Sequence, residues 1–440
     1  MDISRQTIAV IGLGYVGLPL AVEFGKFRPV LGFDINATRI TQLRAGLDNT
    51  LELATPELRE ATHLQYSTDC ADLSGCGVFI VTVPTPVDGL NRPDLGALKA
   101  ASQSIARAMK PGAVVIYEST VYPGCTEEVC VPVLEEFSGL QFNKDFFCGY
   151  SPERIVPGDK INTLKSIKKL TSGSTSQAAQ AIDALYASII TAGTFPVASM
   201  RVAEAAKVLE NTQRDLNIAL INECSVMFQK MGIDTMDVLE AAGSKWNFLP
   251  FRPGLVGGHC IGVDPYYLSY KAQKLDYQPQ TILAGRRINE YMPLYAAREL
   301  VKRMLANGMD IPRCTVGVLG LTAKENCPDI RNSKAVDLVR ELQAWGISVT
   351  LADPLADPAE FKQRYGMTLG DISQMPRVDA LVVAVAHAQY RMLTPEFLRS
   401  MCSTSKTDVN GHDGQPVVAD LKSLYDRHEL AAQGLTVFRL

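Results

Sequence analysis

The sequence predicts an α/β protein with two Rossmann-like parallel-sheet domains, joined by a helical central domain that contains one long spine helix. Short apolar runs alternate with helical patterns over the first 150 residues, and the alternation returns after Ile311. Such alternation is typical of βαβ units that build a parallel sheet. In between, residues 200–231 keep apolar residues at helical spacing without proline or glycine. We expect domains at 1–198, 199–308 and 309–440.

The individual elements follow from the length and composition of these runs. Short apolar runs between turn residues indicate buried strands, and longer amphipathic stretches indicate helices. In the first domain we expect strands at Ile8–Ile11, Val30–Phe33, Val78–Val83 and Val114–Tyr117, and a helix over Pro93–Met109. In the third domain we expect strands at Thr315–Leu319, Ile347–Leu351, Val378–Val385 and Val417–Ala419, and a helix over Ser333–Trp345. The spine helix suggests a homodimer or a higher homo-oligomer.

The bulk composition excludes several classes of protein. With 440 residues, 47% hydrophobic content and a net charge of −4, the chain can form two or three cores and has no basic surface for nucleic acid. No apolar run approaches the roughly 20 residues of a membrane span. The N-terminus lacks a signal-peptide pattern, so we expect a cytoplasmic protein. None of the ten cysteines stands in a CxxC pair, so we expect no metal site.

A glycine-rich turn after the first expected strand predicts a dinucleotide site. The fingerprint Gly12–Gly17 leads into a helical pattern, and Asp34 ends the next expected strand. Gly12 permits the tight turn, Gly14 lets the backbone approach a pyrophosphate, and Gly17 permits close helix packing. Asp34 can accept hydrogen bonds from ribose hydroxyls and would repel a 2′-phosphate, so we expect NAD and not NADP. The alternative is a glycine-rich turn without a ligand.

The stretch 248–265 is the second informative feature, because its glycines and prolines exclude a regular helix. Glycines around Cys260 favour an accessible, reactive thiol, and the alternative is a buried packing cysteine. His259 would suggest a Cys–His pair like that of a hydrolase. Adjacent residues of an extended loop point opposite ways, so we expect that pairing to be geometrically poor. Asp264 follows in the same stretch.

Further clusters stand where ligands are expected. The motifs at 118–124 and 150–154 follow sheet strands, and ligands of open α/β sheets bind at the carboxyl ends of strands. Lys207 and Asn211 are four residues apart and share one face of the long helix, although such a pair more often marks only a solvated face. The third domain repeats the first in degenerate form: Asp353 ends a strand as Asp34 does, but the glycine fingerprint is missing, so no plain dinucleotide site is expected there.

Together these motifs resemble those of the UDP-sugar 6-dehydrogenases, the family of UDP-glucose dehydrogenase. The resemblance runs along nearly the whole chain, through GLGYVGLPLA, VPTP, ESTVYPG, SPER, AEAAKVLENT, PGLVGGHCIGVDPYYL and KENCPDIRNS. The stretch GSKWNFLPFRPGLVGGHCIGVDPYYL is similar to the bacterial branch that acts on UDP-N-acetylglucosamine or UDP-N-acetylgalactosamine for capsule, O-antigen or Vi-type polysaccharides.

The resemblance implies a four-electron oxidation of the sugar 6-hydroxyl to the uronic acid, with two NAD per catalytic cycle. Cys260 would trap the intermediate aldehyde as a thiohemiacetal, and a second hydride transfer would leave a thioester that water hydrolyses. Lys207 and Asn211 would stabilise the developing oxyanion. Asp264 would hold the lysine or a water, Thr120 would position that water, and Glu153 would act as general base.

The resemblance also assigns binding residues. Implied catalytic residues are Cys260, Lys207, Asn211, Asp264, Glu153 and Thr120. Implied cofactor contacts are Gly12, Gly14, Tyr15, Val16, Gly17, Asp34, Arg39, Pro84, Thr85, Ser119, Thr120 and Arg331. Implied UDP-sugar contacts are Glu153, Arg154, Lys207, Asn211, Phe248, Phe251, Arg252, Gly257 and Lys324, so the third domain would bind UDP.

Two positions depart from the family pattern. Ala323 stands where relatives usually carry an aromatic residue, which would loosen the packing at Lys324. His259 stands where the UDP-glucose enzymes often carry an aromatic residue, and the resemblance gives it no role.

Three alternatives stay open. The substrate could instead be UDP-glucose, which would give UDP-glucuronate. A two-electron NAD oxidoreductase, such as a 6-phosphogluconate or 3-hydroxyacid dehydrogenase, would not need Cys260. A catalytically silent sugar-nucleotide-binding protein would form no NADH with any UDP-sugar.

Overall fold

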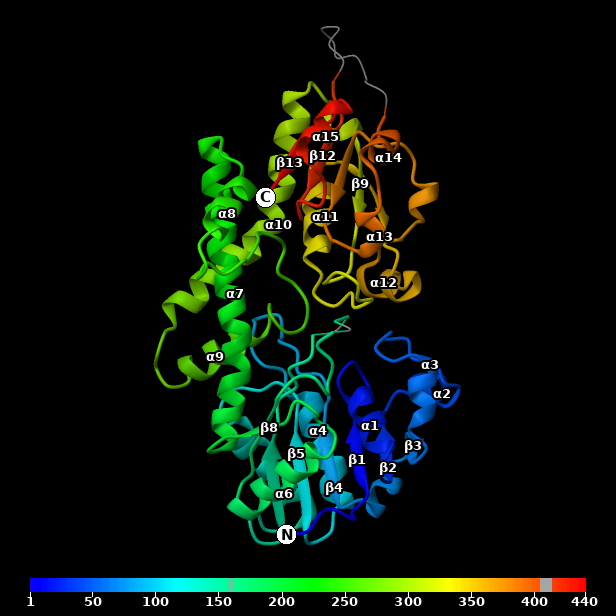
Figure 1. The fold of residues 1–440 in the computed structure, drawn as a ribbon, viewed down its shortest axis with the longest axis vertical. Helices are drawn as coiled ribbons and strands as arrows, with labels where there is room; N and C mark the ends of the chain where they lie inside the picture. The colour runs from blue at the N-terminus through cyan, green and yellow to red at the C-terminus, as the bar shows by residue number, and fades with distance from the viewer. Residues whose placement is uncertain (157, 160, 404–413) are drawn as a thin grey trace. The chain divides into compact units, whose positions relative to one another are not determined.

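Parallel β-sheets organise both compact units of the chain, in a computed structural model that describes residues 1–156, 158–159, 161–403 and 414–440. The first unit comprises Met1–Thr212 and Val263–Pro279, and the second comprises Gln213–Gly262 and Gln280–Leu440. The α/β class with two parallel sheets and a helical central region is confirmed (Figure 1). The domain boundaries expected near residues 198 and 308 stay predictions.

The first unit contains a six-stranded parallel sheet in the order β3-β2-β1-β4-β5-β6. This is the order of a doubly wound sheet, and its topological switch point lies between β1 and β4. The strands are β1 (Ile8–Ile11), β2 (Val30–Phe33), β3 (Leu64–Ser67), β4 (Val78–Val81), β5 (Ala113–Tyr117) and β6 (Phe146–Tyr150). All four strands expected here are present. β4 ends at Val81, earlier than expected, and the hydroxyl of the next residue, Thr82, donates to the carbonyl oxygens of Ile11 and Gly12.

Helices cover both faces of this sheet. One face packs against α4 (Gly96–Ala108) and α5 (Val131–Ser138), and the other against α1 (Gly17–Gly25), α2 (Ala37–Arg44) and α6 (Ser176–Ala187). Alternate residues of β1 enter the two cores, which explains its fully apolar sequence. The unit also contains α3 (Thr55–Glu60), the small parallel pair β7 (Lys169–Thr171) and β8 (Thr194–Pro196), and α9 (Asp264–Gln273).

Local capping explains where several helices begin and end. The Asn36 side chain accepts a hydrogen bond from the Arg39 backbone N–H before α2, and Thr175 accepts one from Ala178 before α6. α5 ends at Gly139, whose φ of 70° is in the left-handed region that favours glycine.

The long helix α7 runs from Met200 to Met231, as predicted. Its first part belongs to the first unit and its second part to the second unit. Ala203 and Val208 enter the core beside α4 and α5, which anchors the first part. The second unit adds α8 (Thr235–Gly243) and α10 (Gln280–Ala306).

A five-stranded parallel sheet in the order β10-β9-β11-β12-β13 forms the centre of the second unit. Its strands are β9 (Thr315–Leu319), β10 (Ser348–Ala352), β11 (Ala380–Val383), β12 (Val417–Asp420) and β13 (Thr436–Arg439). One face packs against α10 and α11 (Lys334–Ala344), and the other against α14 (Pro395–Ser400) and α15 (Arg427–Ala432). Two short helices, α12 (Pro358–Tyr365) and α13 (Ala388–Arg391), complete the unit. Every strand expected here is present, and β11 is shorter than expected at both ends.

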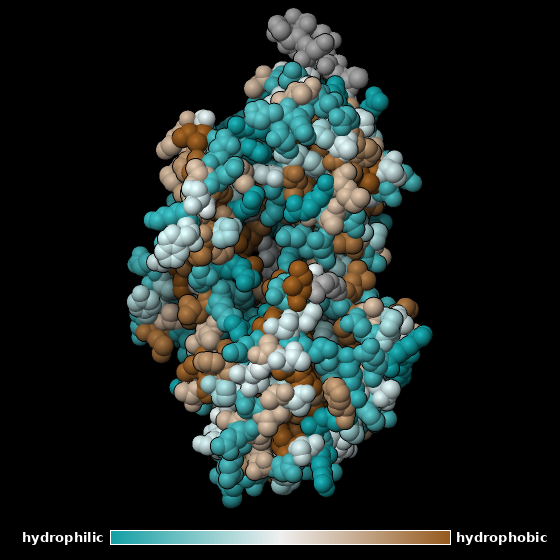
Figure 2. Space-filling view, viewed as in Figure 1, coloured by the Kyte–Doolittle hydropathy of each residue, from teal (hydrophilic) through white to brown (hydrophobic). Residues whose placement is uncertain are grey.

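The surface carries both hydrophobic and hydrophilic residues. Hydrophobic residues on the face drawn in Figure 2 lie among hydrophilic ones. Among the residues that the structure describes, no helix has the length and apolar character that crossing a membrane requires.

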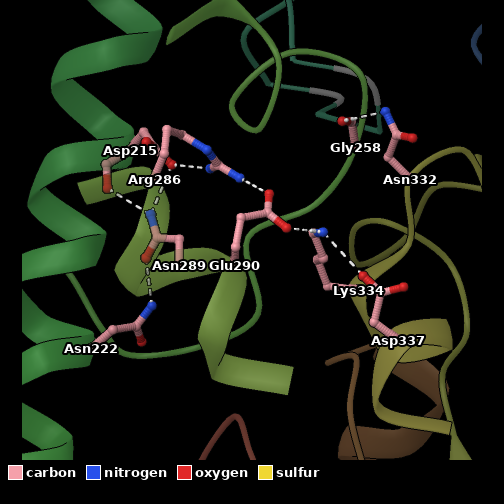
Figure 3. Close-up of polar contacts among 9 residues, drawn as sticks. All are labelled: Asp215, Asn222, Gly258, Arg286, Asn289, Glu290, Asn332, Lys334 and Asp337. Atoms are coloured by element: carbon pink, nitrogen blue, oxygen red, sulfur yellow. Dashed lines mark hydrogen bonds and ion pairs between the residues drawn. The ribbon is translucent and has the colours of Figure 1, made fainter. Parts of the chain in front are cut away.

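A buried polar cluster ties α7 to α10 inside the second unit (Figure 3). Arg286 Nη1 lies 2.6 Å from Asp215 Oδ1, and both side chains are almost completely buried. Asn289 Nδ2 donates to the same carboxylate oxygen at 2.8 Å. Arg286 also pairs with Glu290, which in turn pairs with Lys334 at the start of α11. The cluster therefore joins three helices of this unit.

We expect Arg286→Met to destabilise the protein by about 3–5 kcal/mol, because it leaves Asp215 buried without its cation. Burial already raises the pKa of Asp215, although Arg286 opposes that rise, so the loss should be smaller in acid, where the carboxyl becomes neutral. Urea unfolding measures the change. The neighbouring Arg287 is exposed, and Arg287→Met serves as the matched control. Equal unfolding midpoints for the two variants would contradict the expectation.

Candidate functional site

The glycine turn after β1 has the geometry of a phosphate-binding loop. Gly12 has a φ of 94°, which favours glycine, and a Cβ on Gly17 would lie 1.9 Å from the Gly12 carbonyl oxygen. A Cβ on Gly14 would meet nothing within 4 Å, so the backbone is open on that side. These properties are a tight turn, close helix packing and room for a ligand against the backbone.

Two features beside this turn suit a dinucleotide. No side chain caps α1 at Val16 and no acidic residue stands in its first turn, so its N-terminus can meet a phosphate. Asp34 Oδ2 accepts from the Leu13 N–H at 2.8 Å, which fixes the carboxylate at the end of β2. Arg39 is turned into the protein: its Nε donates to the Leu13 carbonyl at 2.9 Å, and it pairs with Asp48 at 2.8 Å. These residues fit NAD, with Arg39 supporting the loop.

The predicted residues after β4 and β5 lie together at the carboxyl edge of the sheet. Thr85 Oγ1 donates to the Thr120 carbonyl at 2.7 Å, and Ser119 Oγ donates to the Val83 carbonyl at 2.7 Å. The Tyr267 hydroxyl donates to the Thr85 carbonyl at 2.9 Å, which fastens α9 to this edge. Pro84 is exposed beside them.

Lys207, Asn211 and Asp264 are buried polar residues of the first unit. They are only 8%, 7% and 1% exposed, which rules out a merely solvated helix face. Asn211 Nδ2 donates to Asp264 Oδ2 at 2.5 Å. Asp264 stands in the first turn of α9, where the positive end of the helix dipole favours a carboxylate. Lys207 lies one turn before Asn211 on α7.

Glu153 pairs with Lys169, a buried cation that the sequence analysis did not identify. Its Oε1 accepts from the Arg154 and Ile155 N–H groups at 2.6 and 2.7 Å, and its Oε2 lies 3.0 Å from Lys169 Nζ. Lys169 Nζ also lies 2.7 Å from Glu118 Oε2. The side chains of Lys169 and Glu118 are almost fully buried, so one cation serves two carboxylates away from water.

The two carboxylates respond differently to this burial. Burial raises the pKa of Glu118 to about 7, against the attraction of Lys169. For Glu153, burial is outweighed by Lys169 and the two backbone N–H groups, which lower its pKa. The Tyr186 hydroxyl also donates to Glu118. Glu153 is therefore the anion of the pair near neutral pH, and Glu118 can hold a proton.

Another buried carboxylate shapes the loop after β5. Glu204 on α7 accepts from the N–H groups of Gly124 and Thr126 at 2.5 and 3.0 Å, and from the Thr126 hydroxyl at 2.6 Å. Burial raises the pKa of Glu204 to about 7 despite these hydrogen bonds. This contact fixes the loop of the 118–124 motif against the helix that carries Lys207.

The loop around Cys260 (residues 248–263, the cysteine loop) is fastened at two points inside the second unit. Figure 3 shows one of them, where the Asn332 side chain meets the Gly258 carbonyl. Asn222 on α7 bonds both sides of Gly254: its Oδ1 accepts from the Gly254 N–H at 2.8 Å, and its Nδ2 donates to the Gly254 carbonyl at 3.0 Å. Further along, the Gly258 N–H donates to the Asn332 carbonyl at 3.2 Å. A Cβ on Gly257 would lie 2.4 Å from that same oxygen, so only glycine fits there.

The expectation that His259 and Cys260 point apart is wrong. Residues 258–263 form turns, so the loop is not extended here, and the two side chains lie near enough for Cys260 to raise the pKa of His259. His259 Nδ1 lies 2.8 Å from Asp329 Oδ2, and Arg331 Nη2 lies 2.7 Å from the same oxygen. Arg331, a predicted cofactor contact, therefore lies beside the cysteine loop.

The predicted UDP-sugar residues of the second unit gather around two loops. A Cβ on Gly258 would meet the Ala323 side chain at 3.7 Å, so the loop of Lys324 adjoins the cysteine loop. The Thr322 hydroxyl donates to the Lys324 carbonyl at 2.9 Å. Phe248 and Phe251 are half-buried and Arg252 is exposed. Within the described residues, no group of three or more histidine, cysteine or acidic side chains could hold a metal ion.

We expect Lys169→Met to destabilise the protein by about 3–5 kcal/mol near neutral pH, because two buried carboxylates lose their cation. Without Lys169 the pKa of Glu118, which burial already raises, moves further above its unfolded value, and Glu153 loses a cation that lowers its pKa. Both carboxyls then favour the protonated form more strongly, so stability is lost as pH rises from about 4.5. The variant should therefore be closest to the wild type in acid and furthest from it at pH 8. Thermal unfolding across this range measures the effect. Lys168→Met, at an exposed neighbour, is the control, and parallel curves for the two variants would refute the role.

Comparisons with known proteins identify the family of the chain. Sequence models of the UDP-glucose/GDP-mannose dehydrogenase family match the chain with the NAD binding domain at residues 6–190, the central domain at 201–291 and the UDP binding domain at 317–427. The chain is 56% identical to UDP-N-acetyl-D-glucosamine 6-dehydrogenase of Pseudomonas aeruginosa, over 95% of this chain and 97% of that one. It is 53% identical to the protein of the same name from Salmonella typhi, over 90% and 93%.

A solved structure is similar over the same length. UDP-D-ManNAc dehydrogenase from Pyrococcus horikoshii matches with a TM-score of 0.87 and 30% identity, covering 98% of each chain. The family resemblance inferred from the motifs is confirmed. The chain therefore belongs to the UDP-glucose/GDP-mannose dehydrogenase family and is an NAD-dependent UDP-sugar dehydrogenase.

Proposed function

We propose that the protein oxidises the C6 hydroxyl of a UDP-N-acetylhexosamine to the carboxylate, in two steps that consume two NAD per sugar. The observation that carries the proposal is Cys260, a half-exposed thiol on a glycine loop that Asn222 and Asn332 fasten to the protein. The 56% identity to the Pseudomonas aeruginosa enzyme favours UDP-N-acetylglucosamine over its galacto epimer and over UDP-glucose.

The first step converts the alcohol to the aldehyde, and a covalent step follows. NAD, which the Gly12–Gly17 turn and Asp34 would hold, would supply the acceptor for the C6 hydride, and the hydroxyl proton would pass to a general base. The Cys260 thiolate then attacks the aldehyde carbon, a C–S bond forms, and the carbonyl pair moves onto oxygen. Lys207 and Asn211 donate to this oxyanion, which a buried cation and a fixed amide stabilise better than water would. Removal of the second hydride leaves the thioester.

Hydrolysis completes the reaction. Glu153, whose lowered pKa keeps it ionised, takes a proton from the attacking water, and Thr120 helps to position that water. The C–S bond breaks, and the thiolate of Cys260 is regenerated. Asp264 keeps Asn211 oriented through their hydrogen bond. Cys260 and Asp264 are four residues apart, so the chain itself limits the distance between their Cα atoms to about 14 Å.

Several further residues would contact the substrate. Arg154 would contact the sugar beside Glu153, while Lys324 and Arg252 would contact the UDP. Phe248 and Phe251 would line the sugar-nucleotide site, and Gly257 would let the loop backbone approach it. Lys and Arg suit this role because they donate to phosphate oxygens.

We further propose that the protein is a dimer that pairs through α7. On the second part of this helix, Leu220, Met227 and Met231 are 58%, 43% and 64% exposed. Their spacing of seven and four residues places them on one face, as does the spacing of exposed Val202 and Leu209 on the first part. An exposed apolar stripe of this kind is typical of an interface.

A cytoplasmic location and a role in surface polysaccharide synthesis complete the proposal. Nucleotide sugars are made in the cytosol, and 51% identity to Protein CapL of Staphylococcus aureus supports the link to a surface glycan.

The substrate and the stoichiometry can be tested together. We expect two NADH for each UDP-N-acetylglucosamine consumed, a slower reaction with UDP-glucose, and little reaction with NADP, which Asp34 would repel. Cys260→Ser should abolish formation of the acid, because serine cannot form the thioester. NADH absorbance and mass spectrometry of the product measure both. Cys70→Ser, at an exposed cysteine outside the site, is the control. Full turnover of Cys260→Ser to the acid would refute the mechanism.

Charged substitutions on the exposed apolar stripe of α7 test the proposed dimer. We expect the double variant Leu220→Glu, Met227→Glu to sediment as a monomer, since four like charges would face one another across the pair, whereas the wild type sediments as a dimer. Arg214→Glu adds charge at an exposed position about 120° around the helix and should leave the dimer intact. A monomeric wild type, or an unchanged double variant, would refute the interface.

A further inference from the structure

His259 occupies a connected polar group that the proposed reaction does not yet use. Its Nδ1 lies 2.8 Å from Asp329 Oδ2, and Cys260 follows it in the same turn, near enough to raise its pKa. Arg331 Nη2 lies 3.1 Å from Nδ1 and 2.7 Å from the Asp329 oxygen. The thiol is therefore next to an imidazole that contacts a carboxylate, and a guanidinium contacts that carboxylate in turn.

Asp329 is itself held firmly. Its Oδ1 accepts from the Arg331 backbone N–H at 3.0 Å and from Arg331 Nε at 2.8 Å. Arg331 and His259 outweigh burial and hold the pKa of Asp329 well below its usual range. The carboxylate is thus a permanent anion facing Nδ1, and a proton on Nδ1 leaves Nε2 as the nitrogen that can accept another.

The charges around the imidazole favour its protonated form. Burial alone would lower the pKa of His259, and Arg331 acts in the same direction. Cys260 and Asp329 outweigh both and raise the pKa of His259 to about 9. Cys260, Asp329 and Arg331 are thus the charged and titratable groups with the largest effects on the ring. The His259 side chain keeps 33% of its surface exposed, so the group remains open to solvent and reagents.

We propose that His259 is a catalytic residue that takes the proton of the Cys260 thiol, with Asp329 as the residue that positions its ring. The inference rests on the proposed function, because it gives Cys260 a nucleophilic role. It adds a base for the thiol, which the family resemblance did not supply.

The proton and electron pairs balance over the cycle. The thiol proton moves to the imidazole, which leaves a thiolate beside an imidazolium. The thiolate pair forms the C–S bond with the aldehyde carbon, and the imidazolium holds its proton while the second hydride leaves. When water has cleaved the thioester, the thiolate returns to the imidazolium. A thiolate is the reactive form of cysteine, and a neighbouring cation favours it.

Alkylation of the intact enzyme by iodoacetamide, followed by mass spectrometry of the Cys260 peptide, tests the proposal without any turnover. In the wild type we expect the rate to be nearly constant above pH 7. In His259→Asn the rate should climb with pH toward a midpoint of about 8.5, the ordinary value for a thiol. At pH 7 the variant should react about tenfold more slowly, because thiolate is scarcer although each thiolate is more nucleophilic.

Two further variants keep the test decisive. Asp329→Asn leaves the imidazole in place but removes its anion, and should move the midpoint in the same direction by a smaller amount. His428→Asn, at an exposed histidine, should behave as the wild type. A misfolded variant would expose buried thiols such as Cys148, whose alkylation would reveal it. A Cys260 midpoint that stays the same in His259→Asn and Asp329→Asn, with buried thiols protected, would overturn the proposal.

The outcome is distinguishable from failure of the proposed function. If Cys260→Ser still forms the acid, the covalent mechanism fails, whatever the alkylation profile. If Cys260→Ser forms no acid but the midpoint does not depend on His259, only the present inference fails.

Discussion

Carboxylates that accept backbone N–H groups are the constraint on which the loops of this protein depend. Asp34 holds the glycine turn through Leu13, Glu204 holds the loop after β5, and Glu153 bonds the two N–H groups that follow it. In the second unit, Asp353 accepts from Leu321 and Thr322 in the same way. A loop at the carboxyl edge of a parallel sheet has N–H groups without strand partners, and a fixed anion satisfies them. The same anions create the electrostatic field in which the site residues lie.

Burying a carboxylate costs free energy, and different changes offset that cost at different positions along the chain. Lys169 offsets the charge of Glu153, whereas Glu118 beside it moves toward the neutral form. Glu204 has no cation in its hydrogen-bonded group and also moves toward the neutral form. Environments that push the pKa values of neighbouring carboxyls apart are typical of sites that must transfer protons. The first unit therefore contains both a fixed anion and groups that can release a proton near pH 7.

The elements that repeat locally could be predicted from the sequence, and the contacts between distant residues could not. Periodicity was sufficient for α7, whose observed ends are those predicted, and for β1, whose four residues are all buried. The ends of β4 and β11 differ from those predicted, because the end of a strand depends on side chains and pairing partners elsewhere in the chain. Lys169 could not be recognised, since a lysine in a polar stretch gives no sign that two carboxylates meet it.

The cysteine loop is a second case in which contacts could not be predicted from the sequence. Glycine spacing identified it as irregular, and that was correct. Whether neighbouring side chains meet depends on the local turn, which one sequence does not specify, so His259 and Cys260 were wrongly expected to diverge. Asp329 lies some seventy positions further along the chain, and only the folded structure shows that it faces His259. The clamp of Asn222 on Gly254 was missed for the same reason.

In the proposed reaction, the two units of the chain supply residues with different roles. The residues that would hold NAD, apart from Arg331, belong to the first unit, whereas Cys260 and its imidazole belong to the second. The sugar must stay attached to the protein while one dinucleotide leaves and another arrives. Because Cys260 and the dinucleotide fingerprint belong to different units, the residue that would hold the sugar covalently is not among those that would bind and release the cofactor.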